Sequence, residues 1–218
     1  MDDSPAGARS RLYSLLSGAF SFPTEVFFEA ANDGVLARQL EDAAAALASP
    51  IALAAGLLRP AAGTYAEFQA DYIASFEVGA AGPPCPLYAG VYLGGRNQVW
   101  EELIRFYNLF GLHLSPENRD LPDHISTELE FMHFLAWKEL ASDSPKAAAS
   151  MRTAQRDFIE RQLLRWIGLL AKRAEKKSAP AFYRALIDLT CEFVGMDLSA
   201  LRDSGHLALA NTGAGVNR

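Results

Sequence analysis

The chain has 218 residues, half of them hydrophobic and 21% charged, which supports one sizeable core and excludes a disordered chain. Its formal net charge of −6 argues against nucleic-acid binding, because a basic surface supplies most of the affinity for phosphate backbones. The two cysteines, Cys85 and Cys191, form no CxxC pair, so the sequence predicts neither a zinc site nor a disulfide framework.

The N-terminal segment is polar and opens with two acids, and it lacks the basic and then apolar regions of a secretory signal. No apolar run reaches the roughly 18 residues that cross a bilayer. A reducing compartment is the simplest setting for two distant cysteines. We therefore expect a soluble cytoplasmic protein with no stable membrane association.

Apolar residues repeat at helical spacing from the N-terminus onward. The first stripe comprises Leu12, Leu15, Leu16, Ala19 and Phe20. A second helix follows, with Pro23 expected in its first turn. Residues 34–49 and 50–58 are rich in Ala and Leu, which favour helix. Residues 64–77 place one face of a further helix on Tyr65, Phe68, Tyr72, Ile73 and Phe76.

The helical pattern breaks in the segment 78–96, which we call the connector. It carries five glycines and three prolines, and consecutive prolines cannot lie inside a helix. It nevertheless contains several large apolar residues, namely Leu87, Tyr88, Val91, Tyr92 and Leu93. An apolar, aromatic connector must either fold back onto the core or contact a partner.

Helical spacing resumes at residues 97–111, where Gly111 is the expected stop. A polar linker then precedes a predicted helix from Pro122 to about Ala141. Two more helices are predicted over residues 144–177 and 179–198, and the tail is expected to fray from about residue 205. The sequence has no alternating strand pattern. It predicts an all-α, single-domain bundle of about eight to ten helices over residues 1–218.

The start of the helix after the linker reads Pro122, Asp123, His124. Leu121 is pushed into extended backbone by the proline, and Pro122 suits the first helical position. Asp123 in the first turn would be stabilised by free amides and the helix dipole. A plain helix start is therefore one interpretation of these residues.

Chemistry at the same residues is less favoured. His133 lies nine residues after His124, about 180° around a helix, so the two histidines and Glu128 cannot share one metal ion. Neighbouring helical residues point about 100° apart, which disfavours an Asp123–His124 catalytic pair. No phosphate-binding glycine motif is present. We expect no metal, cofactor or catalytic residue, and a small hydrolase or nucleotide-binding enzyme using Asp123 and His124 stays the alternative.

The connector and the start of this helix could together form a peptide groove. Apolar walls would take a hydrophobic run, and the Asp123 carboxylate would pair with a guanidinium. Tyr88 and Tyr92 could instead fill the core. The groove requires that the two segments lie side by side and that Asp123 is accessible.

Two motifs resemble a known family. Residues 121–136, LPDHISTELEFMHFLA, are similar to the signature of the redox-enzyme maturation chaperones (the TorD/DmsD/NarJ family), and the matching residues are Pro122, Asp123, His124, Glu128, Leu129, Phe131 and Met132. Upstream, PPCPLYAGVYLGG resembles the aromatic loop of that family through Pro86, Tyr88, Val91 and Tyr92. Family members more often carry Glu-Ser where this chain has Ala89 and Gly90. The resemblance spans roughly residues 10–200, and its motifs cover about 80–140.

The resemblance implies a cytoplasmic, non-enzymatic chaperone without a cofactor of its own. Such proteins bind the twin-arginine leader or the N-terminal region of a molybdenum oxidoreductase catalytic subunit until its molybdopterin cofactor is loaded. The candidate peptide-binding residues are Asp123, His124, Tyr88, Tyr92, Pro86 and Leu87. Residues 96–112 look most like the branch serving dimethyl sulfide, ethylbenzene or chlorate enzymes. A monomer or a helix-exchanged dimer is expected.

Overall fold

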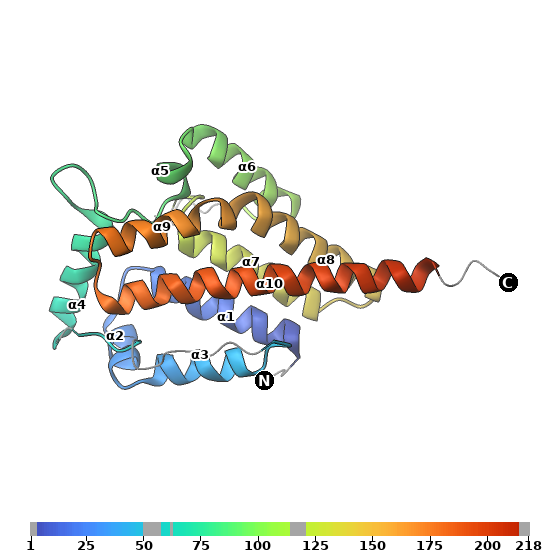
Figure 1. Ribbon diagram of the computed structural model, residues 1–218, viewed down its shortest axis with the longest axis horizontal. Helices are drawn as coiled ribbons and strands as arrows, with labels where there is room; N and C mark the ends of the chain where they lie inside the picture. Colours follow the sequence, from blue (N-terminus) through green and yellow to red (C-terminus); the bar gives the residue numbers. More distant parts are fainter. Residues whose placement is uncertain (1–3, 50–57, 62, 114–120, 214–218) are drawn as a thin grey trace.

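The computed structural model describes residues 4–49, 58–61, 63–113 and 121–213, with side chains described as far as residue 203 (Figure 1). These residues form an all-α bundle, as the sequence predicts, and apart from two isolated bridges they contain no β-structure. No helix in this part of the chain is both long enough and apolar enough to span a bilayer. The helix predicted over residues 50–58 lies almost wholly outside the described residues.

The centre of the bundle is the pairing of α1 (Pro5–Phe20) with α7 (Ile125–Leu140), which is the most extensive helix contact. Ser4 caps α1 by accepting the Gly7 N–H, and Pro5 begins the helix where its missing donor costs nothing. The predicted stripe of α1 faces inward, with Leu12, Leu16 and Phe20 fully buried.

Two short helices, α2 (Glu25–Asn32) and α3 (Val35–Ala45), follow α1 along one side of the bundle (Figure 1). The Thr24 hydroxyl accepts the Phe27 N–H and caps α2, so Pro23 lies before the helix. The prediction of Pro23 in the first turn was therefore wrong, because the hydroxyl cap comes one residue later. Gly34, at φ +71°, makes the left-handed turn into α3.

The next helix, α4 (Tyr65–Tyr72), begins with a reciprocal capping box between Thr64 and Glu67. It continues as a single π-helical turn, η2 (Ile73–Glu77). Phe68, Tyr72 and Phe76 are buried and contact the ring of Tyr183, with ring centroids 5.0 to 5.9 Å apart. The aromatic face predicted for this helix is confirmed.

The C-terminal half consists of α6 (Arg96–Leu109), α8 (Pro145–Phe158), α9 (Leu164–Lys176) and α10 (Ala181–Gly213). Gly111, at φ +70°, follows α6 where a stop was predicted. The single helix predicted over 144–177 is interrupted by a π-helical turn, η3 (Ile159–Leu163). Figure 1 shows α10 running along the whole bundle, with α5 and α6 on one side and α2 and α3 on the other. Fraying of the tail from about residue 205 stays a prediction.

Candidate functional site

The connector lies directly against the start of α7, as the groove hypothesis requires. The Ala89 N–H donates to the Asp123 carbonyl at 2.9 Å, and the Ile125 N–H donates to the Leu87 carbonyl at 2.9 Å. The rings of Tyr88 and His124 meet edge to face, with centroids 4.9 Å apart. Within the connector, residues Ala89–Leu93 form a short helix, α5, that the glycines and prolines did not predict.

The first residues of α7 differ from the prediction. The helix begins at Ile125, and His124 is its N-cap, with Nδ1 accepting the Ser126 N–H at 3.3 Å and lying 2.6 Å from Ser126 Oγ. Pro122 and Asp123 therefore precede the helix and do not form its first turn. The reason is that the Asp123 backbone and side chain are both bonded to the connector, which leaves the cap to His124.

Asp123 is completely buried. Its Oδ2 accepts the backbone N–H of Gly90 at 2.9 Å, and its Oδ1 accepts the indole N–H of Trp100 at 2.7 Å. Both oxygens are thus occupied by internal donors, which is how a buried carboxylate is stabilised without a cation. The expected accessibility of Asp123 to a guanidinium is not found; the carboxylate instead fastens the connector to α6 and α7.

His124, the N-cap of α7, and His133 within α7 point to different sides of the helix. His124 faces Ser126 and the connector, whereas His133 Nδ1 lies 2.9 Å from both the hydroxyl and the carbonyl oxygen of Ser10 on α1. This agrees with the helical spacing that separated them. Across the described ranges no group of three or more His, Cys, Asp or Glu residues is arranged to hold a metal.

The apolar residues of the connector divide into a buried base and an outer crest. Pro86 and Leu87 are buried, Tyr88 and Tyr92 are half-buried, and Val91 is 41% exposed. The Tyr92 ring stacks on Trp166 of α9 at 5.5 Å, and its hydroxyl donates to the Pro86 carbonyl at 2.9 Å. Burial raises the pKa of the Tyr92 phenol. The connector therefore folds back onto the core and also presents an apolar crest.

Arg173 of α9 holds the other end of the connector. Its guanidinium donates to the Pro84 carbonyl and, at 3.3 Å, to the Pro83 carbonyl. It also lies 5.7 Å from the centroid of the Tyr92 ring, within the range of a cation–π contact. The connector is consequently held at two interior points, by Arg173 at Pro83 and Pro84 and by Asp123 at Ala89 and Gly90.

Beneath the connector, Glu128 is an acid in the core. It is fully buried one turn after His124, and its Oε2 accepts a long hydrogen bond of 3.4 Å from the indole of Trp166. Its Oε1 has no hydrogen-bond partner. Burial raises the pKa of Glu128 well above its usual value, which outweighs the lowering by Trp166, and the neighbouring Asp123 raises it further.

Sequence reasoning missed Gly90, Trp100, Trp166 and Arg173. Gly90 had a visible signal, because the chain departs there from the Glu-Ser of the family that it resembles. An added Cβ at this position would lie only 3.0 Å from Asp123 Oδ2. A tryptophan needs an acceptor for its N–H when it is covered. Sequence does not say which acceptor it finds, since Trp100 is 23 residues from Asp123 and Trp166 is 38 residues from Glu128.

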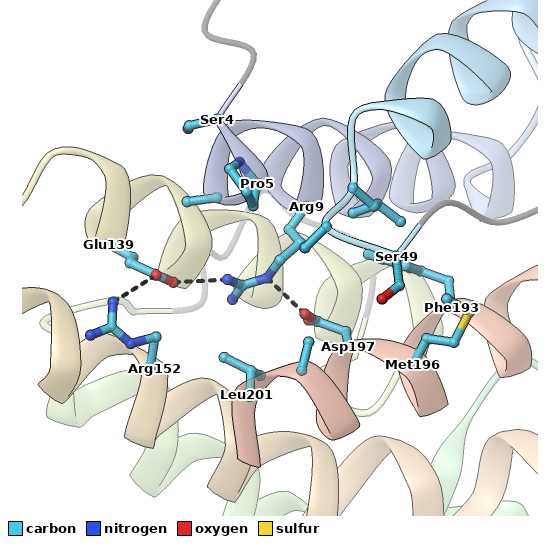
Figure 2. Close-up of a pocket in the computed structure, with 14 residues that line it drawn as sticks. Ser4, Pro5, Arg9, Ser49, Glu139, Arg152, Phe193, Met196, Asp197 and Leu201 are labelled. Atoms are coloured by element: carbon cyan, nitrogen blue, oxygen red, sulfur yellow. Dashed lines mark hydrogen bonds and ion pairs between the residues drawn. The ribbon is translucent and has the colours of Figure 1, made fainter. Parts of the chain in front are cut away.

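A pocket of about 370 Å³ lies away from the connector, between the N-terminus of α1 and α10 (Figure 2). Figure 2 shows a charged cluster at its floor: Arg9 lies 2.7 Å from Asp197 and 3.1 Å from Glu139, which also pairs with Arg152 at 3.1 Å. Two cations and two anions balance, and the Tyr13 hydroxyl donates to Asp197 at 2.7 Å. The cluster thus ties α1, α7, α8 and α10 together.

The pKa values in this cluster reflect burial and pairing. Burial lowers the pKa of Arg9. The negative charges of Asp197 and Glu139 raise it by a larger amount, so the net shift is upward. Burial also raises the pKa of Asp197 against the lowering by Arg9. These are the properties of a closed structural network, and the site that the motifs single out remains the connector.

The comparisons with known proteins agree on one family. The model described as "Nitrate reductase delta subunit" matches residues 34–172. The chain is 35% identical to the perchlorate reductase assembly chaperone protein of Dechloromonas aromatica (strain RCB), covering 89% of this chain and 90% of the relative. It is 33% identical to the dimethyl sulfide dehydrogenase assembly chaperone protein of Rhodovulum sulfidophilum over 96% of this chain and 85% of the relative. Identity to the selenate reductase assembly chaperone protein of Thauera selenatis is 38%, over 55% of this chain and 63% of the relative.

Proposed function

Because the chain belongs to the nitrate reductase delta subunit family of redox-enzyme assembly chaperones, we propose that it binds the leader or N-terminal region of a molybdenum oxidoreductase catalytic subunit in the cytoplasm. This catalytic subunit, which we call the client, would be held until its cofactor is loaded and would then be exported through its twin-arginine leader. The family match covers both the connector and the start of α7, which supports a role for this region.

One structural observation carries the proposal: an apolar crest is presented on a connector that is fastened from beneath. Tyr88, Val91 and Tyr92 form the crest, and buried contacts hold it in place. An extended or helical apolar peptide binds to such surfaces mainly through apolar contact. A Kd near 1 μM corresponds to about −8 kcal/mol, which exposed ion pairs alone do not supply.

The six candidate residues take two different roles in this proposal. Tyr88 and Tyr92 contact the client, since both residues are only half-buried. Asp123, His124, Pro86 and Leu87 position the crest. They do not touch the client while the connector lies against α7 as it does in this structure. The net charge of −6 favours a cationic segment at long range and makes the association weaker with added salt.

We propose no catalytic chemistry for Asp123 and His124. The Asp123 oxygens face Gly90 and Trp100, while His124 Nδ1 faces Ser126, so the pair lacks the mutual orientation of a catalytic dyad. These contacts favour a supporting role over the hydrolase or nucleotide-binding alternative. The oligomeric state, monomer or helix-exchanged dimer, stays a prediction.

The test is titration calorimetry with a synthetic leader peptide that carries two adjacent arginines followed by an apolar run. We expect Tyr88→Ala and Tyr92→Ala to weaken binding several-fold, whereas Phe22→Ala should not. Phe22 is the matched control because it is an aromatic residue, 52% exposed, that contacts Tyr72 of α4. Equal binding of the leader and a scrambled peptide, or equal losses in all three variants, would refute the proposal.

A further inference from the structure

Glu128 is the unexplained residue of this region. Its carboxyl is fully buried, one oxygen has a single long hydrogen bond, and the other has none. An unpaired polar group in a core costs stability that an apolar residue of similar size would avoid. Glu128 accepts the N–H of the buried Trp166 indole, a role that a neutral glutamine could fill, so the packing does not account for an acid at this position.

The groups around Glu128 supply no positive charge. The Asp123 carboxylate and the Tyr107 phenol of α6 are the ionisable neighbours, and α9 contributes the uncharged Trp166 indole. On α1, which packs along α7, the cation Arg9 is engaged by Asp197 and Glu139. Within the described chain no ion pair to Glu128 is formed.

The connector covers this acid. Trp166 bonds to Glu128 on one side, and the Tyr92 ring of α5 stacks on Trp166, so the crest is the outer layer over the pair. The part of the connector that carries α5 lies between two glycines with positive φ, Gly82 at +88° and Gly94 at +69°, where the backbone can turn without a side-chain clash. Displacing it would uncover Trp166 and Glu128 together.

The same movement would free a second carboxylate. Gly90 of the connector donates its N–H to Asp123 Oδ2, so lifting the connector takes away that donor. Asp123 lies two residues before α7 and Glu128 lies in the first turn of α7, and the Asp123 carboxylate raises the pKa of Glu128 beyond the effect of burial. Two neighbouring carboxylates that are no longer covered by the connector are best stabilised by two positive charges.

We infer that Glu128 is a covered cation-binding group of the client site, which together with Asp123 takes adjacent arginine or lysine side chains of the client when the connector is displaced. This inference rests on the proposed function. It assigns the acidic part of the site to a state in which the connector is open, whereas the closed structure keeps both carboxyls away from solvent.

The step has a simple proton balance. In the closed protein Glu128 carries a proton; in the complex it is a carboxylate paired with a client cation, and the proton passes to the solvent. Binding therefore releases about one proton per client. By linkage, affinity rises by up to about tenfold per pH unit over the interval where Glu128 is neutral in the free protein and ionised in the complex.

The experiment is calorimetry of the full chain with a synthetic leader that has two adjacent arginines, in phosphate and in Tris at the same pH and ionic strength. The difference in observed enthalpy between the buffers gives the number of protons released. We expect about one for the unmodified chain and none for Glu128→Gln. This variant keeps Asp123, so its preference for the Arg-Arg peptide over the Gln-Gln analogue should be weaker than that of the unmodified chain but not abolished. Glu130→Gln is the matched control, because Glu130 is exposed on the same helix.

The outcomes separate the two proposals. Leader binding without proton release, unchanged in Glu128→Gln, would overturn this inference and leave the chaperone proposal standing. Absence of leader binding by the unmodified chain would overturn both. If Glu128→Gln folds poorly, an absence of proton release by the unmodified chain still overturns the inference.

Discussion

Replacing Arg9 with Met tests whether the charged cluster at the pocket is a closed structural network. Arg9 is 8% exposed, and it contacts Asp197, Glu139 and Gln155 from three other helices. The methionine keeps most of the side-chain volume but leaves Asp197 buried with only the Tyr13 hydroxyl as a donor. The change therefore isolates the loss of a buried cation from the loss of packing.

The expected cost follows from the burial of the partner. Removing one member of a buried ion pair destabilises a protein by about 3–5 kcal/mol, because the remaining charge is left uncompensated. For a chain of this size, this corresponds to a fall in Tm of about 6–20 °C. The double replacement of Arg9 by Met and Asp197 by Leu should recover a large part of the loss, since it removes the orphaned charge as well.

The assay is urea denaturation followed by far-UV circular dichroism, with Arg152→Met as the control. Arg152 pairs with the same Glu139, but its side chain is 30% exposed, so its replacement should cost about 1 kcal/mol or less. Leader binding should be unaffected at low temperature, because the cluster is separate from the connector. A loss below about 1 kcal/mol for Arg9→Met would show that solvent reaches the cluster and that the network is not closed.

Two further predictions concern the connector. Asp123→Asn replaces one acceptor oxygen by an N–H₂ group that meets the donor of Gly90 or Trp100, so it should cost about 1–3 kcal/mol in denaturant titrations, more than Asp143→Asn on the surface. The raised pKa of Glu128 means that stability is greatest below its unfolded pKa and is lost as pH rises toward its folded pKa. Glu128→Gln cannot ionise, so its Tm relative to the unmodified chain should increase from pH 5 to pH 8; a constant difference would contradict the buried neutral acid.

Most helices could be predicted from the sequence because their apolar residues keep helical spacing even where a local irregularity interrupts the helix. The stripe of Leu12, Leu16 and Phe20 is buried as predicted, and Gly111 ends α6. The π-helical turn η3 escaped prediction, since one extra residue in a turn barely changes the spacing of a long apolar face. The start of α7 was placed too early, at Pro122, because an aspartate after a proline has the ordinary chemistry of a first helical turn.

The buried contacts of the site were harder to predict, because its hydrogen bonds join residues that are far apart in the sequence. Proximity of the connector and α7 followed from the two motifs, but the depth of Asp123 depends on Gly90 and Trp100, which lie 33 and 23 residues away. A carboxylate that is paired with a peptide and one that is bonded to a glycine N–H look the same in sequence. Only the placement of Gly90 and Trp100 around Asp123 in three dimensions distinguishes them.

A motif acid can be important for binding without being exposed. Asp123 accepts the N–H of Gly90, and Gly90 lies in the short helix α5 that carries Tyr92. The Tyr92 ring stacks on Trp166, which in turn bonds to Glu128. A substitution at Asp123 would thus change the crest, the cover and the second acid at once. Loss of peptide binding in such a variant is therefore no evidence of a direct contact, and proton release on binding is the observable that separates a supporting acid from one that pairs with the client.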